Sequence, residues 1–151
     1  MNPKDFLRTA KNLCNRFPHE ADFRSAVSRA YYAVFNYARE RLLEEGIVYD
    51  RVDVHSSIVK ELRNCGINDL PELEYLKEPI KRFEVLRRDR VRADYEMNDT
   101  TFADQKQTFL LVNRAEEIVE AFDKQNLNTY KLKLMAKGIR NYRKQILRTS
   151  R

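Results

Sequence analysis

The residues best suited to do chemistry lie in one arginine-rich stretch, residues 80–95, which reads IKRFEVLRRDRVRADY. Steps of three and four residues follow the helical period, so one helix face carries five of these side chains: Ile80, Phe83, Arg87, Val91 and Asp94. The stripe begins apolar and becomes ionic, which places charge at the edge of a core or an interface. Guanidinium groups in such a position bind phosphate or carboxylate oxygens well. We therefore expect the functional site in this stretch.

No residues have the spacing of a metal site. The chain has only two histidines, His19 and His55, and both cysteines, Cys14 and Cys65, lie far from them in sequence. His55 stands at the start of a predicted helix, where a histidine is more often a surface or capping residue than a catalytic one. We expect no metal and no cofactor, and we expect the cysteines to remain thiols.

The elements that position the arginine-rich stretch are predicted to be helices only. Charged residues make up 34% of the 151 residues, with three glycines, four prolines and no strand-like alternation, so the fold class is all-α. No apolar run approaches the length of about 18 residues that spans a membrane, and residues 1–16 lack the apolar stretch of a secretory signal. We expect a single cytoplasmic domain without a membrane span.

Apolar periodicity and capping residues predict helices over residues 3–16, 20–45, 54–64, 80–95 and 102–124, with Asn2 and Asp53 as caps. These form an antiparallel up-and-down bundle of four to five main helices. The helix over residues 20–45 is apolar around most of its circumference and is expected to be central. Its polar positions Arg29 and Asn36 face either a cleft or water.

The net charge of +6 belongs to the last 25 residues. All 23 acidic residues and 21 of the 29 basic ones lie in residues 1–126, which leaves a net charge of −2 there and eight basic residues in 127–151. We therefore divide the chain into a bundle, residues 1–126, and a basic amphipathic C-terminal helix or arm, residues 127–151.

The C-terminal segment has an apolar seam at heptad spacing, made of Leu132, Met135, Ile139, Tyr142 and Ile146. Gly138 lowers its helix propensity, so we expect it to be unstable alone. It either docks on its own domain or a second copy, or binds nucleic acid, or lies on a membrane surface. The nucleic-acid interpretation uses the basic residues around the seam: Lys131, Lys133, Lys137, Arg140, Arg143, Lys144 and Arg148.

Three motifs in this order resemble the HEPN family, the higher eukaryote and prokaryote nucleotide-binding domains, over about residues 3–124. They are SRAYYAVF (residues 28–35), VHSSI (54–58) and RRDRVRADY (87–95), and they are most similar to a small stand-alone prokaryotic and archaeal branch. The resemblance implies a helical bundle that pairs as a homodimer. It also implies a nucleotidyltransferase as a partner, because family members often occur beside one in toxin–antitoxin pairs, with Tyr95 as a modification target.

In the family's ribonucleases, an arginine followed by a polar residue precedes a histidine by four to six residues, and two such motifs meet in the dimer and cleave RNA without metal. Arg88 with Asp89 fits the first two positions, Arg87 is the other candidate arginine, and Asp94 stands where the histidine would be. A carboxylate cannot repeat the roles of an imidazole near pH 7. The candidate catalytic residues are therefore Arg87, Arg88, Asp89, Asp94 and Tyr95.

Three interpretations of these residues remain. In a ribonuclease, Arg87, Arg88 and Arg92 of two chains stabilise charge on the phosphate, with Tyr95 or His55 near the ribose hydroxyl. In a module that binds RNA, a nucleotide or another phosphate-bearing ligand, the arginines hold the phosphate and Asp94 orients Arg90 from four residues away. In the third, the residues form only a solvated ion-pair network. We favour the binding module, whose ligand-binding candidates are Arg29, Asn36, Arg90 and Arg92.

Overall fold

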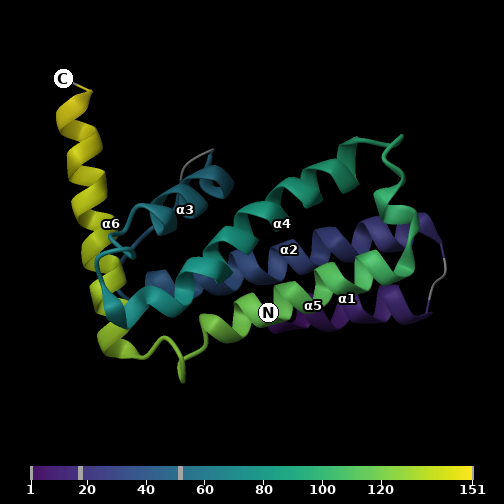
Figure 1. Cartoon of the computed structure of the whole chain (residues 1–151), viewed down its shortest axis with the longest axis horizontal. Coiled ribbons are helices and arrows are strands. Elements are labelled where there is room, and N and C mark those ends of the chain that lie inside the picture. The colour runs from purple at the N-terminus through teal and green to yellow at the C-terminus, as the bar shows by residue number, and fades with distance from the viewer. Residues whose placement is uncertain (1, 17–18, 51–52, 151) are drawn as a thin grey trace.

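The computed structural model describes residues 2–16, 19–50 and 53–150, and these parts of the chain contain helices and no strand. The order is α1 (Lys4–Arg16), α2 (Glu20–Leu43), α3 (Val54–Arg63), the 3-10 helix η1 (Pro71–Leu76), α4 (Lys77–Tyr95), the 3-10 helix η2 (Thr100–Ala103), α5 (Gln105–Ala121) and α6 (Thr129–Thr149). The predicted all-α fold is confirmed. In Figure 1, α1, α2, α4 and α5 lie side by side with alternating directions, and α6 crosses one end of this bundle.

Side-chain capping defines the start of some helices but not of others, such as α2 and α4. The Asn2 side chain accepts a hydrogen bond from the Lys4 amide at 2.9 Å, as predicted. Asp53 stands at the N-cap of α3, but its side chain makes no capping bond, so its predicted capping role is wrong. The helix predicted over residues 102–124 begins later, because residues 100–103 form η2 and the Asp104 side chain caps α5 through the Lys106 amide.

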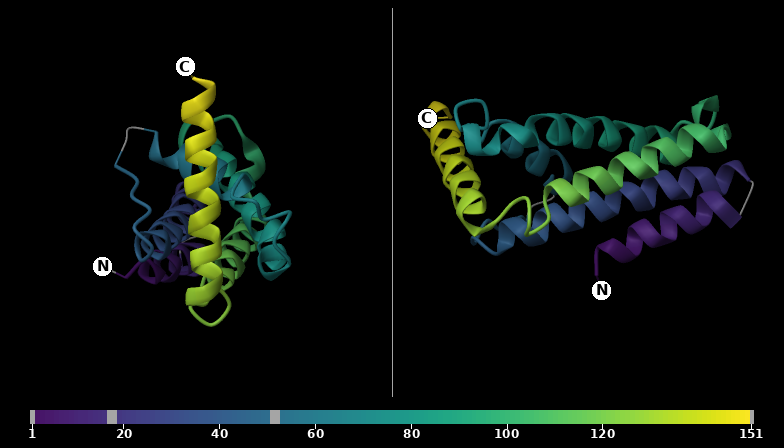
Figure 2. Two further views of the ribbon diagram at one scale, coloured as in Figure 1. Left: turned by 90° about the vertical axis from the view of Figure 1, so that its left-hand side faces the viewer. Right: turned by 60° about the horizontal axis from the view of Figure 1, so that its bottom comes forward.

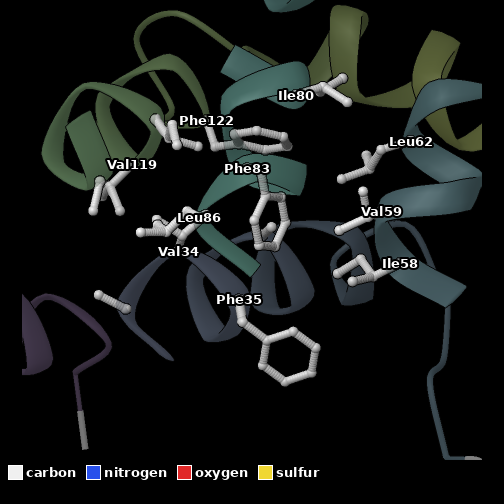
Figure 3. Packing of buried hydrophobic residues seen from close by; sticks show 14 of the residues in the cluster. Val34, Phe35, Ile58, Val59, Leu62, Ile80, Phe83, Leu86, Val119 and Phe122 are labelled. Atoms are coloured by element: carbon white, nitrogen blue, oxygen red, sulfur yellow. The ribbon is translucent and has the colours of Figure 1, made fainter. Parts of the chain in front are cut away.

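The helix α2 is the centre of the core, as its apolar circumference predicted. It packs against α1, α4 and α5, and its inner side chains are almost completely buried. Figure 3 shows Phe83 of α4 directed toward Phe35 of α2, with residues of α3 beside it. The two rings and the neighbouring branched side chains belong to one hydrophobic cluster: Val34, Phe35, Ile58, Val59, Leu62, Phe83 and Phe122.

Two arginines of α2 are buried and bind backbone carbonyl groups of distant segments. Arg24, 8% exposed, donates to the carbonyl oxygens of Ala93, Glu96, Met97 and Asp99, which lie at the end of α4 and in the following loop. Arg41, 3% exposed, donates to the carbonyl oxygens of Phe122 and Leu127, which flank the connection to α6. Each guanidinium thus ties one end of α2 to carbonyl groups at a helix end and in a loop, where few backbone donors are available.

The first half of α6 belongs to the same core as the bundle, because Leu132, Met135 and Ile139 are buried in it. Gly138 allows the close approach, since a Cβ atom there would overlap the carbonyl group of Cys65. The predicted seam does not continue as a buried stripe: Tyr142 is only partly buried and Ile146 is 38% exposed. The reason is geometric, because α6 crosses the end of the bundle and its last turns extend beyond it (Figure 2).

Arg143 fastens the second half of α6 to α3 through the carboxylate of Glu61, with Nε···Oε1 and Nη2···Oε2 distances of 2.8 and 2.9 Å. The guanidinium also lies 5.1 Å from the centre of the Tyr49 ring. None of the described helices is long and apolar enough to cross a membrane.

Both cysteines are free and buried. Burial raises the pKa of the Cys14 thiol to about 11, and it raises that of Cys65 to about 11 as well. Neither thiol is therefore ionised near neutral pH.

Candidate functional site

The buried side of α4 differs from the stripe that its sequence predicted. Leu86 and Ala93 are buried, whereas Val91, which we placed in the stripe, is 38% exposed. The second half of α4 packs toward α2 and η2, where Ala93 contacts a small cluster with Val27 and Phe102. The second half of α4 is therefore turned about its axis relative to the prediction. Arg87 and Asp94, the charged members of the predicted stripe, lie partly buried beside the core rather than in it.

Five side chains from α2, α3 and α4 meet beside this helix, and the charge of Arg87 acts on His55 among them; we call all six the arginine–aromatic cluster: Tyr31, Tyr32, His55, Arg87, Arg90 and Asp94. Arg90 is its most constrained member. Its Nη2 donates to the Tyr32 hydroxyl at 3.0 Å, and its guanidinium lies 5.5 Å from the centre of the Tyr32 ring. Two aromatic rings thus lie close to one guanidinium, because the centre of the Tyr95 ring is 5.8 Å away.

Asp94 completes the support of Arg90. Its Oδ2 lies 2.8 Å from Arg90 Nε, the contact at a spacing of four residues that the sequence predicted. The contact is an ion pair without hydrogen-bond geometry, and the buried Nε has no hydrogen-bond partner among the described residues. Ser28 Oγ donates to the same carboxylate oxygen at 3.4 Å. Asp94 therefore contacts residues of both α2 and α4, and it holds the guanidinium group of Arg90 in position.

His55 lies at the centre of the cluster and not in a capping role. Its Nδ1 shares a 2.8 Å hydrogen bond with the Tyr31 hydroxyl, and its ring centre lies 4.2 Å from that of Phe35. Burial lowers the pKa of His55, and the positive charges of Arg90, Arg87 and Arg39 lower it further. The imidazole is thus neutral near pH 7, because burial and three guanidinium groups disfavour its protonation.

The depressed pKa of His55 predicts a pH-dependent stability. Between the ordinary histidine pKa of 6.5 and the lower folded value, the unfolded chain binds a proton that the folded protein does not. We therefore expect the melting temperature to fall as the pH is lowered from 7.5 to 5.5, and less so in His55→Gln. Thermal unfolding at several pH values checks this, with the exposed His19 changed to Gln as the matched control. Equal pH dependence in wild type and His55→Gln contradicts the assignment.

Two other predicted site residues of α4 do not join the cluster: Asp89, a catalytic candidate, and Arg92, a ligand-binding candidate. Arg92 binds Asp89 at 3.1 Å and Asp99 at 2.7 Å, and it also donates to Thr101 Oγ1 at 3.2 Å. These contacts hold the loop between α4 and α5. Burial raises the pKa of Asp89, although Arg92 acts in the opposite direction. Asp89 and Arg92 therefore form a structural ion-pair group on a different side of α4.

Four further predicted residues lie at the edge of the cluster or outside it. Arg88 is exposed and lines an open surface hollow with Arg63 and Ile67. Arg29 is exposed, and the Asn36 side-chain amide donates to the Tyr32 carbonyl within α2 at 2.9 Å. Tyr95 is 70% exposed and touches the cluster only through Arg90.

Tyr31, Tyr32 and Arg39 were not identified as site residues from the sequence. A signal was present, because Ser28, Tyr32 and Arg39 recur at helical spacing along one side of α2. Among the described residues there is no group of three or more histidine, cysteine or carboxylate side chains that would hold a metal ion.

The profile of one protein family, described as the HEPN domain, matches residues 3–125. The match covers the bundle and the whole arginine–aromatic cluster, and it ends before α6. No curated protein and no solved structure matches the chain.

Proposed function

Because this chain belongs to the HEPN domain family, which is consistent with a nucleotide- or RNA-related function, we propose that it is a homodimeric module whose arginine–aromatic cluster binds a phosphate group of RNA or of a nucleotide. The observation that carries the proposal is an excess of positive charge around His55. Arg39, Arg87 and Arg90 all act on His55, and within the cluster only Asp94 is acidic. An anion bound there would gain Coulomb energy from two or more guanidinium groups.

The aromatic side chains support a nucleotide rather than a simple anion. Tyr95 is exposed to solvent beside Arg90, and Tyr32 contacts the same guanidinium. Bases stack on exposed aromatic rings and on guanidinium planes, while phosphate oxygens accept bidentate hydrogen bonds from arginine. The arrangement thus offers both kinds of contact within one patch.

The homodimer is supported by apolar side chains that remain exposed next to the cluster. Val91 and Tyr95 project from α4, and Met97 follows in the loop, where it is 66% exposed. Pairing through this face would bury them and bring two sets of guanidinium groups together. In a toxin–antitoxin or defence system with a nucleotidyltransferase partner, the accessible Tyr95 hydroxyl is the group that we propose for modification.

We expect Arg87→Ala to weaken binding of a labelled 20-nucleotide RNA, or of a nucleotide triphosphate, about tenfold, because one charged contact to phosphate is lost. Arg88→Ala is the matched control, since it removes the same charge from the adjacent, exposed position and should change the affinity less than about threefold. Fluorescence anisotropy measures RNA binding and calorimetry measures nucleotide binding, both in excess EDTA. Equal losses in the two variants, or no binding by wild type, contradict the proposal.

His55 gives an independent readout of the same site. A phosphate bound near Arg87 and Arg90 offsets their charge, so the His55 pKa should rise when ligand is added. Proton NMR of the two histidines follows this, with His19 as the internal reference. Sedimentation of the same samples tests the dimer, and a monomer at concentrations that bind ligand contradicts that part.

A metal-independent ribonuclease is the second candidate, and the central position of His55 favours it. In such a reaction His55 Nε2 takes the proton of a ribose 2′-hydroxyl, whose oxygen attacks phosphorus, and the 5′-oxygen leaves with a proton from water. This requires His55 Nδ1 to carry its proton and donate to Tyr31 Oη. RNA that is cut in EDTA by wild type but not by His55→Gln identifies an enzyme, and RNA that stays intact identifies a binding module.

A further inference from the structure

The outer face of α6 carries a continuous stripe of positive charge. Five basic residues recur at steps of four, three, four and four, which keeps them on one side of a helix over about 22 Å. All five are exposed: Lys133, Lys137, Arg140, Lys144 and Arg148. The opposite side of the same helix carries the buried residues Leu132, Met135 and Ile139.

The contacts of α6 divide its basic residues into two groups. Lys131 lies 4.7 Å from the Tyr75 ring centre and donates to the Asn126 carbonyl, and Arg143 pairs with Glu61, so these two hold the helix in place. Arg140 donates one N–H group to the Glu45 carbonyl. By contrast, four side chains make no hydrogen bond or ion pair within the described residues: Lys133, Lys137, Lys144 and Arg148.

We propose that this stripe binds the phosphodiester backbone of RNA, as a contact surface separate from the arginine–aromatic cluster. The inference rests on the proposed function and specifies its ligand as a polynucleotide. A length of about 22 Å corresponds to about six phosphates along one strand of a duplex. Lysine side chains on a helix surface suit such a contact, because flexible point charges follow a backbone without reading its sequence.

The position of the stripe favours RNA over the other polyanions. A membrane-surface helix needs a long apolar face beside its cationic one, but the core occupies the apolar face of α6 over Leu132, Met135 and Ile139, and beyond them the only exposed large apolar side chains among the described residues are Ile146 and Leu147. The stripe also lies outside residues 3–125, which match the family. Since α3 packs against both α4 and α6, a ligand that reaches both basic surfaces must extend across it (Figure 1).

The test is a triple variant of the full chain, Lys133→Gln, Lys137→Gln and Lys144→Gln. Its matched control removes the same charge from exposed lysines on α3, α4 and α5: Lys60→Gln, Lys81→Gln and Lys106→Gln. Anisotropy titrations use a labelled 20-nucleotide RNA between 50 and 300 mM salt, with a nucleotide triphosphate as the short ligand. We expect the α6 triple variant to lose at least tenfold in RNA affinity and to flatten the slope of log K against log salt by about 2, since each single-strand phosphate contact contributes about 0.7.

The control should retain RNA affinity within about threefold, and neither variant should change triphosphate binding. Equal losses in both variants, or a loss of binding to phosphatidylserine vesicles but not to RNA, overturn the inference. Loss of RNA binding in Arg87→Ala but not in the α6 triple variant leaves the proposed function standing and overturns this inference. Loss of RNA binding in the α6 triple variant but not in Arg87→Ala supports the stripe and overturns the proposed role of the cluster.

Discussion

Replacing Arg24 with methionine is expected to lower the free energy of unfolding by about 3 to 5 kcal/mol, the largest effect of any single change that we predict. Methionine keeps most of the apolar length of the side chain but provides no donor. Four carbonyl oxygens at the end of α4 and in the following loop would lose their partner. Urea unfolding measures the loss, and faster amide exchange over residues 93–101 locates it.

The matched control for this change is Arg29→Met, five residues later on the same helix and exposed to solvent. Its effect should stay within about 0.5 kcal/mol, as for most surface substitutions. Arg24→Lys should fall between the two, because an ammonium group has fewer donors and lacks the planar fork of guanidinium. A stability of Arg24→Met within 1 kcal/mol of wild type contradicts the role that we assign to this side chain.

Gly138→Ala is expected to destabilise the protein by about 2 kcal/mol, although alanine has the higher helix propensity by about 1 kcal/mol. The added methyl group overlaps the Cys65 carbonyl, which is backbone and cannot move aside as a flexible side chain would. The helix α6 must shift outward, and Leu132, Met135 and Ile139 lose contacts in the core. Thermal and urea unfolding report the loss.

Asn141→Ala tests whether the effect at Gly138 comes from the close approach. Asn141 is exposed three residues further along α6, so alanine there should stabilise by a few tenths of a kcal/mol. An increase in stability for both variants would mean that α6 does not dock closely at Cys65.

The helices could be predicted because their signals are local. Apolar periodicity and the Asn2 cap place α1 and α2 within a few residues of their observed ends. The start of α5 was less predictable, since Asp99 and Asp104 both offer caps and each is used, one for η2 and one for α5. The direction of α6 depends on how closely it approaches Cys65, which no pattern within the segment encodes.

In the site, too, contacts between residues close in sequence could be predicted better than contacts between distant segments. The Arg90–Asp94 pair lies within one turn of one helix and was predicted, whereas His55 reaches the cluster through the packing of α3 and was placed near the arginines only in the ribonuclease interpretation. Arg87 was identified because it is a charged residue in line with an apolar stripe. It applies equally to α2, where Arg24 and Arg41 occupy the two ends of a buried line: Arg24, Val27, Tyr31, Val34, Ala38 and Arg41.

The burial of both native thiols makes this protein suitable for site-directed spectroscopy without prior mutation. Maleimide and methanethiosulfonate reagents need an accessible thiolate, and Cys14 and Cys65 offer neither accessibility nor a low pKa. A cysteine introduced at the exposed Gln145 would therefore be the one site that takes a spin label. A measurable distance between labels on two copies would then test the proposed homodimer in solution.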